Sequence, residues 1–238
     1  PLVVAPVETG VLLLLALASL GVYSLVLAGY GSNNKYSLLG SVRASSQMIS
    51  YELALALSVV AVLMPVESLR LDAVVAHQQG VWLGFLPRWN VLAQPVGFLV
   101  FLIAAFAETN RIPFDLPEAE SELVAGYHTE YSSIKFALFF MGEYMSMATL
   151  SALAATLYFG GWSLPGVDFS GWWVAAALKG IFILVFKIAL FLGFFVWVRW
   201  TYPRFRFDQL LRLGWKVLLP LAVVNLVVVA AMTLAGWI

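Results

Sequence analysis

Long uncharged apolar segments constrain this chain more than any other feature of its sequence. No Asp, Glu, Lys or Arg occurs from residue 9 through 34, and none occurs from residue 217 to the end. A helix needs about 20 predominantly apolar residues to cross the hydrocarbon core of a bilayer. The chain is 62% hydrophobic and 11% charged, whereas soluble domains carry roughly 25% charged residues. The sequence therefore predicts an integral membrane protein.

The number of such segments predicts the fold class. The predicted spans are 9–30, 43–65, 93–111, 131–160, 172–199 and 212–236. Backbone groups in lipid have no water to bind, and a helix satisfies them internally. We therefore expect an all-α polytopic helical bundle with six transmembrane helices, forming one domain over residues 1–238. The chain opens on Pro1 with no charged leader, so we expect a piece of a longer polypeptide that lacks its N-terminal part.

The basic residues predict the orientation of the bundle. Nine of the thirteen fall on one side of the predicted spans: Lys35, Arg43, Arg111, Lys135, Arg199, Arg204, Arg206, Arg212 and Lys216. The other side carries Arg70 and Arg88, and Lys179 and Lys187 fall inside the fifth span. Lys and Arg concentrate in cytoplasmic loops. The 31–42, 108–131 and 200–211 loops are therefore predicted to be cytoplasmic.

Composition also narrows the function. The net charge is zero and no basic tail or stripe is present, which argues against a nucleic-acid partner. There are no cysteines, so disulfides and thiolate-held zinc or iron–sulfur clusters are excluded. We predict no cofactor and no metal in this chain, and any electron transfer needs cofactors on partner chains. No internal repeat is visible, so an inverted-repeat transporter gains no support.

Four ionisable residues fall inside the predicted spans. Glu52, Glu143 and Lys187 are central in the second, fourth and fifth spans, and Glu108 lies about one turn from the end of the third. An ionisable group in a span costs a few kcal/mol on insertion scales and is a functional candidate by default. We predict a hydrated proton path along these four residues. A buried Glu–Lys pair is the structural alternative.

Two other charges have structural interpretations. Glu8 follows Pro6 at the start of the first span, where a carboxylate complements the helix dipole. Lys179, nearer the end of the fifth span, can extend its ammonium toward water. Neither is predicted to belong to the proton path.

The most unusual segment is the acidic stretch, residues 108–132, which reads ETNRIPFDLPEAESELVAGYHTEYS. It holds six of the thirteen acidic residues and one basic residue, Arg111. The carboxylates alternate with Pro, Phe, Leu and Val, which favours a loop packed against a partner or a ligand chamber. A solvated acidic loop is the alternative.

Turn and helix signals divide the acidic stretch. The residue before a proline is disfavoured in the α region, so Pro113 predicts that the third span ends near Asn110. Pro117 fits the first turn of a short helix, in which Glu118 and Glu122 would share a face. Gly126 allows the chain to turn before the next span. His128 beside Tyr127 and Glu130 is either a hydrogen-bonded structural residue or part of a proton relay.

The acidic stretch resembles the signature of the quinone-chamber membrane subunit of bacterial respiratory complex I, the proton-translocating NADH:quinone oxidoreductase. Two other segments resemble further signatures of that family. These are GSNNKYSLLGSVRASSQMISYE, residues 31–52, and RWTYPRFRFDQLLRLGWKVLLPL, residues 199–221. The three motifs occur in the family's order, so the resemblance extends along essentially the whole chain.

The resemblance implies a place in a larger assembly. Such subunits have eight or nine spans and lie in the bacterial inner membrane. NADH electrons pass through FMN and iron–sulfur clusters on peripheral-arm subunits and reach quinone in a chamber bordered by this subunit. Antiporter-like and small membrane subunits are its other partners. The subunit has no redox centre and is not active alone. Alternatives are the equivalent subunit of a membrane-bound hydrogenase, an autonomous ion transporter and a structural anchor for the peripheral arm.

Carried over residue by residue, the resemblance assigns three sets of positions. The residues implied to line or border the quinone chamber are Arg111, Asp115, Glu118, Glu120, Glu122, Tyr127, His128 and Glu130. Glu52, Glu108 and Glu143 match intramembrane carboxylates of the proton route. In the basic loop, residues 199–211, Arg199, Arg204 and Arg206 are implied to contact the peripheral arm.

Overall fold

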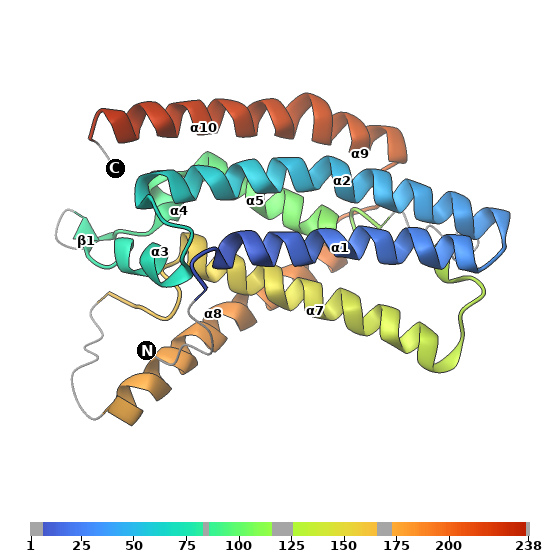
Figure 1. The fold of residues 1–238 in the computed structure, drawn as a ribbon, viewed down its shortest axis with the longest axis horizontal. Helices are drawn as coiled ribbons and strands as arrows, with labels where there is room; N and C mark the ends of the chain where they lie inside the picture. Colours follow the sequence, from blue (N-terminus) through green and yellow to red (C-terminus); the bar gives the residue numbers. More distant parts are fainter. Residues whose placement is uncertain (1–6, 83–85, 116–125, 166–172, 237–238) are drawn as a thin grey trace.

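The computed structural model describes residues 7–82, 86–115, 126–165 and 173–236, and long helices dominate it (Figure 1). The principal helices are α1 (Gly10–Gly31), α2 (Lys35–Leu63), α5 (Pro95–Glu108), α7 (Ser133–Tyr158), α8 (Trp173–Thr201) and α10 (Leu219–Leu234). α9 (Phe207–Leu213) and a π-helical turn, η3 (Gly214–Leu218), lead directly into α10. The all-α polytopic membrane fold predicted from the sequence is confirmed.

Short elements close one end of the bundle, here called the α3 end. They are η1 (Met64–Val66), α3 (Leu71–His77), β1 (Val81–Trp82), β2 (Leu86–Pro87) and α4 (Asn90–Ala93). β1 and β2 form a small antiparallel hairpin in which Val81 pairs with Pro87. The opposite end, the η2 end, carries the 3₁₀ turn η2 (Gly126–His128). It also holds the end of α1 and the starts of α2 and α7 (Figure 1).

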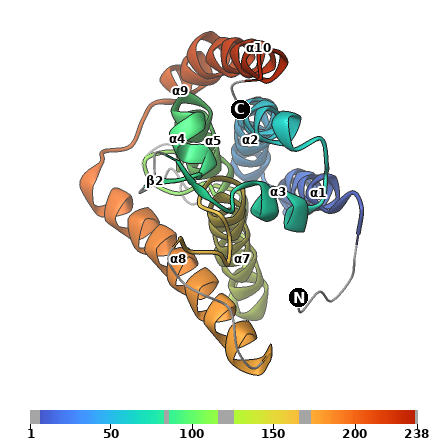
Figure 2. The same ribbon diagram turned by 90° about the vertical axis from the view of Figure 1, so that its left-hand side faces the viewer.

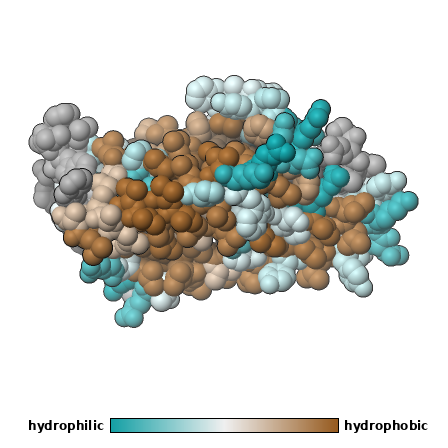
Figure 3. All heavy atoms as spheres, turned by 90° about the horizontal axis from the view of Figure 1, so that it is seen from above, coloured by the Kyte–Doolittle hydropathy of each residue, from teal (hydrophilic) through white to brown (hydrophobic). Residues whose placement is uncertain are grey.

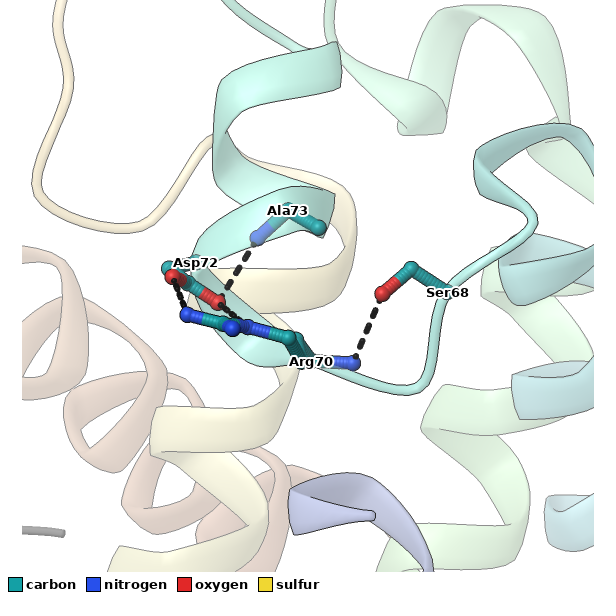
Figure 4. A network of polar contacts seen from close by, with 4 residues as sticks. All are labelled: Ser68, Arg70, Asp72 and Ala73. Carbon is teal, nitrogen blue, oxygen red and sulfur yellow. Dashed lines mark hydrogen bonds and ion pairs between the residues drawn. The ribbon is translucent and has the colours of Figure 1, made fainter. Parts of the chain in front are cut away.

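A small polar network begins α3 (Figure 4). The Arg70 guanidinium donates from Nε and Nη2 to the two carboxylate oxygens of Asp72 at 3.0 and 2.7 Å. Asp72 also accepts from the Ala73 amide at 3.1 Å, in the first turn of α3. The Arg70 hydrogen bond, with its charge, holds the pKa of Asp72 below its usual value. A first-turn carboxylate satisfies amides that have no partner within the helix.

Within the described part of the chain, five helical segments are long and apolar enough to cross a membrane: Gly10–Gly31, Lys35–Val66, Ser133–Tyr158, Ala176–Thr201 and Phe207–Leu234. The third predicted span is shorter than expected, because α5 has 14 residues and is about 21 Å long. Pro95 lies in the first turn of α5, and Asn110 adopts a left-handed conformation with φ 49° just beyond its end. The predicted range 93–111 therefore overestimated this helix at both ends.

Two predicted loops are also shorter than expected. α2 begins at Lys35 instead of near residue 43, with the Asn34 side chain capping it by accepting from the Tyr36 amide at 3.0 Å. α8 continues to Thr201 and α9 begins at Phe207, so the basic loop contains only residues 202–206 as a non-helical connection. Hydropathy detects the part of a helix that suits lipid. It does not detect polar turns that continue the helix against other parts of the protein.

α2 is the central helix of the bundle, and it packs against α1, α5 and α10 (Figure 2). Small residues allow this close packing. A Cβ atom added at Gly29 of α1 would lie 2.0 Å from Ser41 Oγ, and one added at Gly40 would lie 3.1 Å from the Gly126 Cα atom. Close approach at small residues is a usual device in membrane helix pairs, where lipid provides no hydrophobic drive between helices.

The outer surface is strongly apolar. Large areas of apolar side chains cover the face shown in Figure 3, on which α10 lies toward the viewer. Exposed side chains there and elsewhere include Val224 and Val227 of α10, Leu27 of α1, and Trp197 and Trp200 of α8. Figure 2 shows α8 inclined to the rest of the bundle. Such surfaces suit contact with lipid or with other membrane-embedded chains.

Candidate functional site

The 109–115 turn follows α5 and carries the first charged residues of the acidic stretch. It is held by Gln47 of α2, whose side chain is fully buried. The Gln47 amide nitrogen donates to the Ala107 carbonyl at 2.9 Å and to the Phe114 carbonyl at 2.8 Å. The Phe114 amide in turn donates to the Arg111 carbonyl at 2.7 Å. One side chain of the central helix thus connects both ends of the turn.

Arg111 points from this turn toward α7. Its Nη2 atom lies 3.8 Å from Glu143 Oε2, and its guanidinium lies 4.5 Å from the centre of the Tyr144 ring. The Arg111 and Glu143 side chains are only 10% and 13% exposed. Water screens such a pair weakly, so a change of charge on either group acts strongly on the other.

Glu108 is the last residue of α5, and its side chain is 8% exposed. Its buried Oε2 atom has no hydrogen-bond partner among the described residues. The carboxyl group lies within electrostatic range of Glu52 on α2. Glu52 is half-buried and accepts a hydrogen bond from Ser19 Oγ of α1. We call Glu52, Glu108 and Glu143 the carboxylate cluster, because they come from three neighbouring helices and face the interior on the side of the 109–115 turn.

Asp115 connects the acidic stretch to the basic loop. Its carboxylate lies 3.1 Å from Nη2 of Arg204, and its side chain is 4% exposed. The Phe205 amide donates to the Pro113 carbonyl at 3.1 Å, and the rings of Phe114 and Phe205 lie 5.7 Å apart. This part of the acidic stretch is therefore packed against protein. Glu118, Glu120 and Glu122 lie outside the described residues, as does the short helix predicted after Pro117.

The remainder of the acidic stretch packs at the η2 end. Gly126 has a φ of 62°, as the predicted turn requires. The Tyr127 side chain is buried, and its carbonyl accepts from Ser37 Oγ at 2.8 Å. The His128 ring packs edge-on against Tyr127. Glu130 is exposed and accepts from Asn34 Nδ2 at 2.8 Å.

Lys187 lies apart from the carboxylate cluster, although it is central in α8 as predicted. Its Nζ atom donates to the carbonyls of Phe159, Gly161 and Ser163 at 2.6, 2.8 and 2.7 Å. The ammonium also lies 5.4 Å from the centre of the Trp89 ring. These carbonyls follow the end of α7, so Lys187 is level with the α3 end of that helix. The buried Glu–Lys pair is not what these contacts form.

The predicted partner-contact residues lie at the η2 end of the bundle. Arg199 is exposed near the end of α8, and Arg206 is exposed immediately before α9. Arg204 is 41% exposed while it pairs with Asp115. Arg199 and Arg206 therefore present charge outward, whereas Arg204 also holds the 109–115 turn.

Three residues of this region were not predicted from the sequence: Ser19, Gln47 and Tyr144. Ser19 and Gln47 had a detectable signal, because a polar side chain on a membrane helix needs a partner and marks a contact between helices. Tyr144 had none, since an aromatic residue in an apolar span is ordinary. Among the described residues, no group of His, Cys, Asp and Glu is arranged to hold a metal ion.

The fold and this site define a class of protein: a polytopic helical membrane protein that keeps ionisable side chains inside its bundle. The family model described as "NADH dehydrogenase" matches residues 1–230. The chain belongs to this family, which confirms the resemblance seen in its three motifs.

Similar proteins carry more specific names. The H subunit of the NADH-quinone oxidoreductase of Thermomicrobium roseum is 53% identical over 229 residues, covering 95% of this chain and 64% of that protein. The protein of the same name from Flavobacterium psychrophilum is 49% identical, covering 93% of this chain and 64% of its own length. The first of the numbered H subunits of Cytophaga hutchinsonii is 45% identical, with 96% and 65% covered. The chain thus spans slightly less than two thirds of these relatives.

Proposed function

We propose that this chain is part of the membrane subunit of a proton-translocating NADH:quinone oxidoreductase. In this role it borders the quinone chamber and couples quinone reduction to proton translocation. The names of its relatives, each of them the H subunit of an NADH-quinone oxidoreductase, support the assembly. FMN and iron–sulfur clusters on peripheral-arm subunits supply the electrons. Antiporter-like and small membrane subunits complete the assembly in the bacterial inner membrane, with the η2 end toward the cytoplasm.

The observation that carries this proposal is the position of Arg111. It joins the acidic stretch to Glu143 of α7, while Glu108, three residues earlier, lies near Glu52 of α2. The stretch proposed to border the chamber is therefore continuous with the carboxylate cluster inside the bundle. A charge that appears in the chamber has a short route to groups that can bind or release protons.

The size of this effect is sufficient for coupling. Two unit charges about 4 Å apart interact by roughly 4 kcal/mol at an effective dielectric constant near 20. Quinone reduction consumes two protons and changes the charge in the chamber. A change of that size beside the acidic stretch shifts the balance at Arg111, and with it the charge that Glu143 experiences. Glu108 can take up a proton at its unpaired Oε2 atom without breaking a hydrogen bond there.

The remaining positions have supporting roles in this proposal. The chamber is bordered by Arg111, Asp115, Glu118, Glu120, Glu122, Tyr127, His128 and Glu130. Arg199, Arg204 and Arg206 contact the peripheral arm. The bond from Arg204 to Asp115 connects those two regions directly. Lys187 was predicted as a fourth member of the proton path. It is held by three carbonyls, so releasing a proton would break one of these bonds.

The test is single replacement of the cluster carboxylates in the intact complex, with quinone reduction and proton pumping measured separately. We expect Glu52→Gln, Glu108→Gln and Glu143→Gln to lower the number of protons pumped per electron pair. Glu67→Gln is the matched control, because Glu67 is exposed beyond the end of α2. Unchanged pumping in all three cluster variants would refute the proposed coupling.

A further inference from the structure

Ser19 is a polar residue in the middle of the most apolar part of the chain, and it faces the carboxylate cluster. It lies on α1, which contains no charged residue. Its hydroxyl oxygen is within hydrogen-bond distance of two acceptors. One is the Leu15 carbonyl, at 2.9 Å, one turn earlier in α1. The other is Oε1 of Glu52 on α2.

Counting hydrogen atoms shows that these two contacts depend on the state of Glu52. A serine hydroxyl has one hydrogen to donate and two lone pairs to accept with. When Glu52 is ionised, its carboxylate can only accept, so Ser19 must donate to it and releases Leu15. When Glu52 is protonated, the acid can donate to Ser19 Oγ, and Ser19 then donates to the Leu15 carbonyl. Both contacts are hydrogen bonds only in the second state.

The Leu15 carbonyl is a suitable second acceptor because it tolerates loss of the bond. Serine hydroxyls in helices commonly bond the carbonyl four residues earlier, and that carbonyl keeps its own helical hydrogen bond. Rotation of the Ser19 hydroxyl therefore leaves neither Glu52 nor Leu15 without a partner. An unpaired buried polar group would otherwise oppose one of the two states of Glu52.

We propose that Ser19 is a positioning residue whose hydroxyl reverses its hydrogen bond each time Glu52 gains or loses a proton. The inference rests on the proposed function, in which Glu52 changes protonation during coupling. The charged group within electrostatic range of Glu52 is Glu108 of α5. Ser19 is thus the neutral partner that serves both states, while Glu108 is the neighbour whose charge drives the change.

Infrared difference spectroscopy on the intact complex during quinone turnover tests this reversal. The carbonyl stretch of protonated Glu52 is identified as the band that Glu52→Gln removes and that shifts in D₂O. We expect Ser19→Ala to move this band to higher wavenumber, because the acid loses the acceptor for its O–H. Ser19→Thr keeps a hydroxyl and should leave the band in place.

Proton pumping supplies the second readout. Loss of one hydrogen bond to a charged group corresponds to about a tenfold change, so we expect pumping by Ser19→Ala to slow about tenfold and Ser19→Thr to restore it. Ser24→Ala is the matched control, since Ser24 bonds the Gly21 carbonyl on the same helix and is exposed. We expect neither the band nor the rate to change in it.

The outcomes separate two kinds of failure. If Glu52→Gln lowers pumping but Ser19→Ala alters neither band nor rate, the role of Ser19 is overturned and the proposed function stands. A shifted band with normal pumping also overturns it, because the bond would then exist without serving coupling. If Glu52→Gln itself pumps normally, the place of Glu52 in the proposed function fails, and the inference about Ser19 fails with it.

Discussion

Replacing Lys187 with Met is expected to loosen the end of α7. The side chain is 7% exposed, and its ammonium donates to the carbonyls of Phe159, Gly161 and Ser163. These carbonyls lie at and beyond the end of α7, where a helix has acceptors without internal partners and a partial negative charge. Met preserves most of the apolar stem but removes all three donors and the charge.

The magnitude follows from two opposing contributions. Three hydrogen bonds at about 1 kcal/mol each contribute about 3 kcal/mol. Bonds that share one donor atom are not additive, and Met avoids the cost of burying an ammonium, which together offset about 1 kcal/mol. We expect a net local destabilisation of about 2 kcal/mol, equivalent to roughly 30-fold faster opening of this segment.

Hydrogen exchange of the amides in residues 155–163, measured on the assembled complex, reads this opening directly. Lys187→Arg should exchange more slowly than Lys187→Met, because a guanidinium retains the charge and several donors. Lys179→Met is the matched control on the same helix, since Lys179 is exposed. Equal exchange in Lys187→Met and Lys179→Met would refute the capping role. Normal exchange with reduced pumping would instead support the predicted place of Lys187 in the proton path.

Two further predictions concern packing and pH. Gly29→Ala should separate α1 from α2, because the new Cβ would lie 2.0 Å from Ser41 Oγ. We expect a loss of about 1–3 kcal/mol, measured by thermal unfolding against Gly142→Ala, which has open space around it. A smaller loss in Gly29→Ala than in the control would contradict the close approach. At the α3 end, burial, assisted by the charge of Arg88, lowers the pKa of His77 below 6.5. The folded state then binds fewer protons than the unfolded state, so stability should fall as pH drops through 6.5. His77→Gln should flatten that dependence, and an unchanged slope would count against it.

The apolar segments predicted the membrane class and most of the helices, because crossing lipid requires a property that is local in the chain. Errors occurred where helices leave the apolar region. Hydropathy could not show that α2 extends back to Lys35 or that α5 stops at Glu108. The acidic motif was also visible in the sequence, since its composition and order are properties of consecutive residues.

The partners of the charged residues depended on the tertiary structure. Glu52, Glu143 and Lys187 were each found as charges in apolar spans, but the sequence does not show which helices lie side by side. Packing placed Arg111 against Glu143, and it brought Lys187 to the carbonyls beyond α7. A single residue reveals the cost of burying its charge, which depends on its own span. The group that offsets this cost lies on another helix, and only the folded chain brings the two together.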